Sequence, residues 1–194
     1  GVVGPATIAK LNDPATKIDY NVVSTTTSTT VATVPGVHDF LFPIVGKVWY
    51  TDTFGVCRDA CTRRHKGEDI IGPRMLPLVA ATDGKVIRMY RNHVTAGNVV
   101  IILGDDGYEY HYYHLNNDNI GTDDGSAPES LTFAPGISVG ARVTRGQLIG
   151  YMGDSGNAEF SVPHLHFELH RPGDVLPVAP FSHLKAAESA ATCA

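Results

Sequence analysis

The segment 162–172 constrains the fold more than any other part of this chain. Its polar and apolar side chains alternate strictly, with His164, His166, Glu168 and His170 on one parity and Leu165, Phe167 and Leu169 on the other. A period of two is typical of a half-buried strand. A helix is the alternative, because His166 and His170 would then stack one turn apart. Pro163 and Pro172 restrict such a helix to about two turns, and the apolar spacing is not helical, so we expect a strand.

The predicted strand places His164 and His166 on the same face, about 6.6 Å apart at about 3.3 Å per residue. This separation suits two groups that act on one metal ion or one substrate bond. His170 lies too far along the strand to join them, and we expect it at the surface. Glu168 shares the histidine face, and we interpret it as part of a groove wall or as a hydrogen-bond acceptor behind the metal ligands.

Length and composition favour a single β-rich domain. The 194 residues are 43% hydrophobic and 18% charged, with 20 glycines and 12 prolines, which suits one core and many turns.

A formal net charge of −5 gives no basic field, so we expect no nucleic-acid partner. No apolar run is long enough for a transmembrane segment, and we expect a monomer. Because the chain begins with Gly1 and not Met, we expect that a signal or upstream domain has been removed.

The pattern along the chain divides it into two parts. Residues 1–36 are an expected N-terminal arm or linker with a Thr-rich run, and residues 37–194 are the expected folded domain. Alternating or β-branched segments predict strands at 78–82, 84–90, 98–103 and 108–115, and a strand-turn-strand unit within 137–153. Residues 116–136, rich in Asn, Asp, Gly and Ser, predict a long surface loop.

Further expectations concern individual residues outside the central strand. His111 and His114 have opposite parity on the strand at 108–115, so only one of them can face a common site. The tail from Ser182 predicts one or two helical turns, with His183 at the surface. Two cysteines four positions apart, Cys57 and Cys61, are expected to form a small disulfide loop that leaves Cys193 unpaired, although a reduced pair is nearly as compatible with the sequence.

Histidine and aspartate residues together indicate a metal site. Zn²⁺ takes imidazole nitrogen and carboxylate oxygen, and catalytic sites commonly keep three protein ligands and one water. His65 and Asp69, with one of His164 and His166, would supply such a set. His114, which belongs to a Tyr-x-His-Leu strand, strengthens the interpretation. Each motif is weak alone, and their combination carries the prediction.

Five motifs in order resemble one known family. They are His65-x-x-x-Asp69, Tyr-Tyr-His-Leu at 112–115, His-Leu-His-Phe-Glu at 164–168, Val-Thr-Arg-Gly-Gln-Leu-Ile-Gly at 143–150 and Gly-Asp-Ser-Gly-Asn at 153–157. Together they resemble the lysostaphin and LytM type of zinc endopeptidase, which cuts bacterial peptidoglycan. The resemblance extends over residues 42–185. Cys57, Cys61 and the long 116–136 segment depart from it, and we expect both features to border the substrate groove.

The resemblance implies a mainly β fold, an antiparallel β-sheet or sandwich domain of the duplicated-hybrid-motif kind with a substrate groove and few short helices. It implies one Zn²⁺ per chain held by His65, Asp69 and His166, with a water as fourth ligand. His164 would be the catalytic base, and His114 a second catalytic histidine that stabilises the transition state. Tyr112, which strict alternation places on the face of His114, could also donate to the oxyanion. The partner would be peptidoglycan, and the location secreted, periplasmic or at the cell surface.

Two other classes of protein compete with the enzyme. A catalytically inactive relative would bind peptidoglycan or regulate another hydrolase, and such a protein would be expected to lack ligands that this sequence retains. A lipoyl-type carrier or phosphotransfer domain would suit the motifs at 83–86 and 143–150. Nothing in the sequence singles out Lys85 as the lysine of a carrier. Stoichiometric zinc would favour the peptidase.

Overall fold

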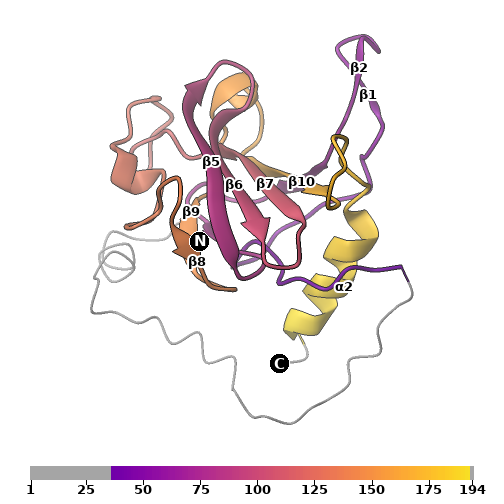
Figure 1. Cartoon of the computed structure of the whole chain (residues 1–194). Helices are drawn as coiled ribbons and strands as arrows, with labels where there is room; N and C mark the ends of the chain where they lie inside the picture. The colour runs from indigo at the N-terminus through magenta and orange to yellow at the C-terminus, as the bar shows by residue number, and fades with distance from the viewer. Residues whose placement is uncertain (1–35, 193–194) are drawn as a thin grey trace.

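A computed structural model describes residues 36–192 of the chain. The expected arm at 1–36 lies outside this range except for its last residue, and Cys193 also lies outside it. Within the described part, the elements are mainly antiparallel strands, followed by one helix near the C-terminal end (Figure 1). The mainly β fold class predicted from the sequence is confirmed.

A six-stranded antiparallel sheet forms the centre of the domain, with the strand order β3-β10-β7-β6-β5-β8. In that order, the strands are β3 (Glu68–Ile71), β10 (His164–His170), β7 (Glu109–Leu115), β6 (Gly97–Gly104), β5 (Gly84–His93) and β8 (Arg142–Val143). β3 therefore lies at one edge of the sheet, beside the histidine strand. Figure 1 shows β5, β6, β7 and β10 side by side.

Two smaller strand pairs accompany this sheet. β4 (Pro77–Val79) pairs with β9 (Leu148–Tyr151), and β1 (Cys57–Arg58) pairs with β2 (Arg63–Arg64). The β1–β2 hairpin stands away from the body of the domain in Figure 1. Single 3₁₀ turns occur at Glu129–Leu131 (η1) and Gly156–Ala158 (η2), and the helix α2 spans Phe181–Thr192.

The core lies on the apolar face of the sheet. The alternation in β10 has its predicted effect, because Leu165, Phe167 and Leu169 are all fully buried while His164 and His166 remain on the other face. Side chains from β7, from the segment 40–44, from β4 and β9, and from α2 complete the same apolar cluster. Burial of each large apolar side chain contributes about 1.5–3 kcal/mol, so this face anchors β10 firmly and fixes which side chains point outward.

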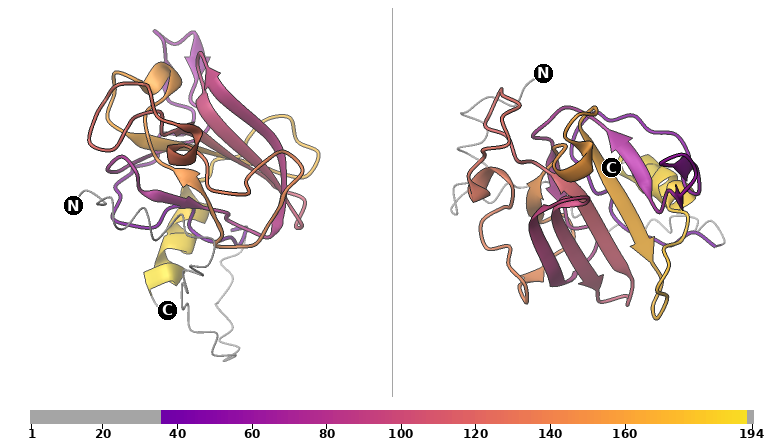
Figure 2. Two further views of the ribbon diagram at one scale, coloured as in Figure 1. Left: turned by 90° about the vertical axis from the view of Figure 1, so that its left-hand side faces the viewer. Right: turned by 90° about the horizontal axis from the view of Figure 1, so that it is seen from above.

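Helix α2 is longer than the sequence predicted, with 12 residues where one or two turns were expected. Its apolar side buries Leu184 and Ala187 in the core, which a short tail without tertiary partners could not do. His183, expected at the surface, is only 7% exposed, and its Nδ1 accepts a hydrogen bond of 2.7 Å from the His38 backbone N–H. The two other views of the ribbon show α2 beside the indigo segment that carries His38 (Figure 2).

The segment 116–136 is irregular, as predicted, but it is not simply a solvated loop. Asp118 and Thr132 are almost fully buried within it. Asp118 makes an ion pair with Arg74, which also pairs with Asp123 and Asp154. The loop was predicted to be exposed because its composition is polar. Composition alone could not show that Arg74, from outside the loop, forms ion pairs with carboxylates in it.

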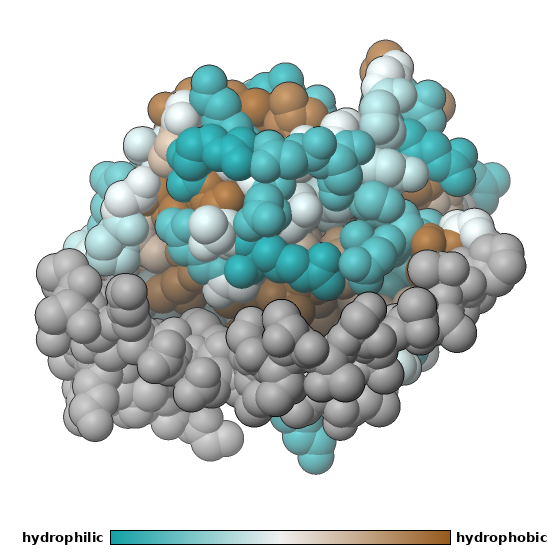
Figure 3. All heavy atoms as spheres, turned by 60° about the horizontal axis from the view of Figure 1, so that its bottom comes forward, coloured by the Kyte–Doolittle hydropathy of each residue, from teal (hydrophilic) through white to brown (hydrophobic). Residues whose placement is uncertain are grey.

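In Figure 3 the face turned forward is mostly hydrophilic, with apolar groups scattered among the polar ones. Among the described residues, no helix is both long and apolar enough to cross a membrane.

Candidate metal centre

Three predicted ligands meet where β3, β10 and the turn before β3 come together. Asp69 and His166 are directly paired across β3 and β10, so their side chains leave the same face of the sheet. His65 follows β2, four residues before Asp69, and is buried. The turn between them passes so close to β10 that a Cβ at Gly67 would lie 2.3 Å from the carbonyl oxygen of Phe167, so only glycine fits there.

The donor atoms of these three side chains converge. His65 Nε2 lies 3.0 Å from Asp69 Oδ1 and 2.9 Å from His166 Nδ1, and His166 Nδ1 lies 2.9 Å from the same Asp69 oxygen. Atoms bound at about 2.0 Å to a tetrahedral ion would stand about 3.3 Å apart, close to this triangle. The geometry therefore matches a site with three protein ligands.

The hydrogen-bond partners of the two imidazoles decide which nitrogens carry protons. His65 Nδ1 lies 3.0 Å from the carbonyl oxygen of Thr53, which can only accept, so Nδ1 carries the hydrogen. His166 Nε2 lies 3.1 Å from Glu168 Oε1, and hydrogen bonds from His166 and His170 lower the pKa of Glu168 to about 2 against the effect of burial. Glu168 is thus an ionised acceptor, and His166 donates from Nε2.

In their neutral forms, His65 and His166 therefore direct an unprotonated ring nitrogen, with its lone pair, towards Asp69. Two lone pairs and one carboxylate oxygen then share a small space without a hydrogen between them. A cation resolves this arrangement, and nitrogen with carboxylate oxygen is a donor set that Zn²⁺ takes. The residues present fit the metal that the sequence predicted.

A buried carboxylate supports the position of His65 from behind. Glu68, which precedes the ligand Asp69, is fully buried and accepts hydrogen bonds from the backbone N–H groups of Thr53 and Phe54. This fixes the loop whose Thr53 carbonyl orients His65. Burial is the main reason that the pKa of Glu68 rises to about 7. Sequence analysis gave Glu68 no role, because its partners, two backbone N–H groups and the Thr53 hydroxyl, lie in a separate loop.

Two further histidines border the three ligands. The His164 ring centroid lies 5.0 Å from that of His114, and the His114 centroid lies 6.0 Å from that of His166. Nδ1 of His164 donates to the Val162 carbonyl, and Nδ1 of His114 donates to the Ser155 carbonyl, each over 2.8 Å. Both rings therefore keep Nε2 free of hydrogen when neutral.

Burial favours the neutral form of both rings. It lowers the pKa of His114 to about 3, with neighbouring His164 and His166 acting in the same direction. It also lowers the pKa of His164. The structure thus brings all five predicted histidine and aspartate residues into one place, with three aimed at one another and two bare imidazole nitrogens beside them.

Tyr112 is a correction to the sequence analysis. Its side chain is fully buried in the core, where its hydroxyl donates to the Val79 carbonyl and accepts from the Ala81 N–H. Alternation would put Tyr112 and His114 on one face, but the backbone of His114 has a φ of 61°, in the left-handed region. That local twist turns His114 away from the core face and towards His164. Tyr113, not Tyr112, lies beside the metal ligands, with its ring centroid 5.3 Å from that of His166.

The same twist explains why His111 and His114 both face outward, although opposite parity allowed only one of them to do so. His111 is paired with Glu168 across β7 and β10. Its ring stacks on that of His170 with the centroids 4.1 Å apart, and His170 Nε2 donates to Glu168 Oε2 over 2.9 Å. His170 is only 7% exposed, so its expected surface position was wrong. Glu168 accepts hydrogen bonds from both His166 and His170. The sequence analysis suggested this role of a hydrogen-bond acceptor behind the predicted metal ligands.

Arg58 was missed entirely by the sequence analysis. Its Nη2 lies 2.6 Å from Asp69 Oδ2, the carboxylate oxygen that faces away from the two imidazoles. The available signal was its place between the two cysteines expected to pair, and the structure confirms the disulfide between Cys57 and Cys61. Nothing in the sequence showed that this loop folds back onto a metal ligand.

Comparison with known families agrees with this geometry. The model of peptidase family M23 matches residues 63–126 and 130–180, which together make up more than half of the chain. The chain belongs to peptidase family M23. All six residues proposed for the site from the sequence lie within the matched ranges of this M23 chain. The resemblance inferred from five short motifs is therefore confirmed.

Curated relatives of this M23 peptidase-family chain include two named endopeptidases. It is 32% identical over 162 residues to the L-Ala–D-Glu endopeptidase of Bacillus subtilis, a match that covers 79% of this chain and 44% of the relative. It is 35% identical over 105 residues to the peptidoglycan DD-endopeptidase ShyA of Vibrio cholerae, covering 54% of this chain and 20% of the relative. The chain thus spans less than half the length of either relative.

Solved structures of the same kind support the M23 fold. A putative glycyl-glycine endopeptidase lytM from Ruminococcus gnavus superposes with a TM-score of 0.61 at 28% identity, covering 79% of this chain and 62% of that chain. A zinc-containing peptidase from Vibrio cholerae gives a TM-score of 0.55 at 28% identity, covering 73% of this chain and 39% of that chain.

Proposed function

We propose that this chain is a zinc-dependent endopeptidase that hydrolyses peptide bonds in the stem peptides or crosslinks of bacterial peptidoglycan. The observation that carries the proposal is the convergence of His65 Nε2, Asp69 Oδ1 and His166 Nδ1, which lie close enough together to bind one metal ion. The bare Nε2 atoms of His164 and His114 beside this triangle supply proton acceptors. A structural metal site would have no use for two such acceptors.

The mechanism assigns different tasks to the five residues. His65, Asp69 and His166 would hold one Zn²⁺, which when bound polarises the scissile carbonyl and lowers the pKa of a water in the fourth position. His164 accepts a proton from the attacking water at Nε2 and returns it to the leaving amine. His164 suits this task because its Nδ1 is fixed on the Val162 carbonyl, so only Nε2 can exchange the proton.

His114 has a related but separate task. Its Nδ1 is fixed on Ser155, and its Nε2 accepts a hydrogen bond in the neutral ground state. It can therefore orient the attacking water, and it becomes a donor to the oxyanion only after it has gained a proton. The transition-state role expected for His114 thus requires prior protonation. Tyr113 replaces Tyr112 as the hydroxyl-bearing neighbour of the centre.

The proposed partner and location follow from the relatives. Peptidoglycan is the substrate named for ShyA, and the Bacillus subtilis relative is named for a bond between L-Ala and D-Glu. We therefore propose that the substrate lies in the cell wall and that the enzyme is secreted, periplasmic or at the cell surface. The inactive alternative would need a missing ligand or base, and here each predicted position is filled.

Digestion of purified cell walls tests the proposal. Walls with direct, glycine-bridged and D-amino-acid crosslinks would be incubated with the zinc-loaded protein, and the released muropeptides identified by mass spectrometry. New amino termini at one type of peptide bond, lost after metal removal by a chelator and restored by zinc, are expected. Stoichiometric zinc without any cleavage of any wall would instead support the inactive, wall-binding alternative.

A further inference from the structure

The β1–β2 hairpin carries Arg58, whose side chain contacts the predicted metal ligand Asp69. It has only two residues in each strand, and Arg63 and Arg64 are exposed. Three successive residues in its turn, Asp59, Ala60 and Cys61, have φ values of 51°, 52° and 68°. This left-handed region is unfavourable for residues that carry a Cβ, and it persists only where the surroundings enforce it.

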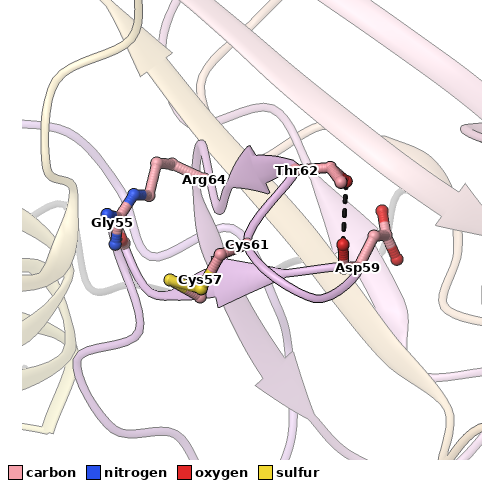
Figure 4. Close-up of a disulfide and its surroundings, with 6 residues drawn as sticks. All are labelled: Gly55, Cys57, Asp59, Cys61, Thr62 and Arg64. Atoms are coloured by element: carbon pink, nitrogen blue, oxygen red, sulfur yellow. Dashed lines mark hydrogen bonds between the residues drawn. A yellow bond between two sulfur atoms is a disulfide. The ribbon is translucent and has the colours of Figure 1, made fainter.

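The disulfide provides that enforcement. It joins Cys57 to Cys61 across the turn, with Cα atoms 4.5 Å apart (Figure 4). Within the turn, Thr62 Oγ1 also donates to the Asp59 carbonyl over 2.8 Å. A hairpin this short, with an exposed second strand, is marginally stable alone, so the covalent link is an important internal constraint beside the ion pair between Arg63 and Asp59. Arg58 is the residue next to Cys57 and shares that constraint.

Arg58 engages one of the two oxygens of Asp69 and leaves the other oxygen facing the imidazoles. Its Nη2 contacts Oδ2, while Oδ1 faces the nitrogens of His65 and His166. A carboxylate without such a partner can rotate or present both oxygens to an ion. With Oδ2 engaged by a guanidinium, only Oδ1 remains for the metal. The contact is also partly shielded, because the Arg58 and Asp69 side chains are 34% and 21% exposed.

We propose that Arg58 is a positioning residue of the metal centre, which holds Asp69 in the orientation for binding through one oxygen, and that the Cys57–Cys61 disulfide acts by keeping Arg58 there. The proposal rests on the proposed function, since it takes His65, Asp69 and His166 as the metal ligands. The proposal thus gives the disulfide loop, which lies outside the metal centre, a role in metal binding.

Zinc affinity tests the proposal without using catalysis. The dissociation constant would be measured by competition with a chromophoric chelator, for wild type, Arg58→Met, Arg58→Lys and the control Arg64→Met. Arg64 lies in the same hairpin and carries the same charge, but its Nη1 donates to the Gly55 carbonyl. Loss of such an outer partner typically weakens metal binding by about 10- to 100-fold. We expect that loss for Arg58→Met, partial recovery for Arg58→Lys and no change for Arg64→Met.

A spectroscopic and a kinetic readout exclude a merely structural effect. The visible absorption of the Co²⁺-substituted protein reports the ligand geometry, and it should change in Arg58→Met but not in Arg64→Met. In wall digestion with saturating zinc, kcat should fall and KM should stay near its wild-type value. Unchanged zinc affinity with a raised KM would overturn the proposal, because Arg58 would then be a substrate-binding residue.

The role of the disulfide is tested by combining variants. Cys57→Ser with Cys61→Ser should weaken zinc binding in the wild-type background and have no further effect in the Arg58→Met background. Equal losses in both backgrounds would show that the disulfide does not act through Arg58, and would overturn that part. Failure of the wild type itself to bind zinc would contradict the proposed function instead, so the two failures are distinguishable.

Discussion

His166 and Asp69 are register partners on neighbouring antiparallel strands, and His166 Nδ1 lies 2.9 Å from Asp69 Oδ1. Paired positions share a face of the sheet, so the backbone hydrogen bonds that align β3 with β10 also align two ligands. The remaining ligand, His65, comes from a turn that is tied to β10 by the close approach at Gly67. Strand pairing therefore sets the geometry of the proposed metal centre.

The two outward histidines of β10 should respond differently to mutation. His166→Ala removes a ligand and should lose most of its zinc, because only His65 and Asp69 remain. His164→Ala should keep zinc but lose hydrolysis by about 10²- to 10⁴-fold, as expected for a missing general base. Zinc content by mass spectrometry and wall clearing by turbidity would measure the two effects. Loss of zinc in His164→Ala with retention in His166→Ala would reverse the assigned roles.

Gly67→Ala should damage the centre although it changes no ligand. The added Cβ would lie 2.3 Å from the Phe167 carbonyl oxygen and 2.9 Å from His166 Nε2, so the turn must move. Overpacking of this kind costs about 1–3 kcal/mol in the free energy of unfolding, and zinc affinity should fall as well. Gly72→Ala is the matched control, because its Cβ meets the end of the flexible Leu76 side chain. Equal urea midpoints and equal zinc affinities for both variants would contradict the prediction.

Tyr112→Phe should affect stability and leave the centre intact. The change leaves the Val79 carbonyl and the Ala81 N–H without their buried partner, which costs about 1–3 kcal/mol. Zinc stoichiometry and activity per folded molecule should stay at the wild-type level. Urea unfolding monitored by circular dichroism would give the stability. A fall in activity at unchanged stability would restore Tyr112 to the role that sequence alternation suggested.

Protonation of His183 should contribute to loss of stability in acid. Burial lowers its pKa, with His38 and Arg171 acting in the same direction, and its Nδ1 accepts the His38 N–H. The unfolded chain, with an ordinary pKa of about 6.5, then binds more protons below that pH than the folded protein does. This contribution is complete above about pH 6.5 and is lost as the pH falls towards the lowered folded-state pKa.

His183→Asn tests that linkage, because the amide oxygen keeps an acceptor near Nδ1 but cannot titrate. Free energies of unfolding would be measured from pH 7.5 to 5.0 for both proteins. Wild type should lose more stability than the variant over the acid half of this range. His93→Asn, at an exposed position, serves as the control. Parallel pH curves for wild type and His183→Asn would show that the buried ring does not drive the effect.

Sequence periodicity predicted the parts of the site that depend on regular strands. Strict alternation in β10 required Leu165 and Phe167 to be buried, and it therefore fixed His164 and His166 on the outer face. His65 and Asp69 were candidate ligands because of their residue types, and the family resemblance selected His166 over His164 as the third ligand. Their spacing along the chain alone did not show that Asp69 would be the register partner of His166.

The errors arise where the backbone leaves the regular pattern or where a distant segment covers a side chain. The left-handed φ of His114 turned its side chain off the core face and towards the centre, while Tyr112 stayed on the core face. His170 was placed at the surface because stacking on His111, from a different strand, leaves no trace in the local sequence. Arg58 escaped notice for the same reason.

The long separation between His65 and His166, 101 positions, determines when during biosynthesis the centre can exist. β10 is the last strand of the sheet, so a growing chain that has made β3 still lacks its third ligand. Until translation passes residue 166, only two of the three proposed ligands exist. If the proposed metal centre forms, it can therefore be completed only after the last strand of the sheet has been synthesised.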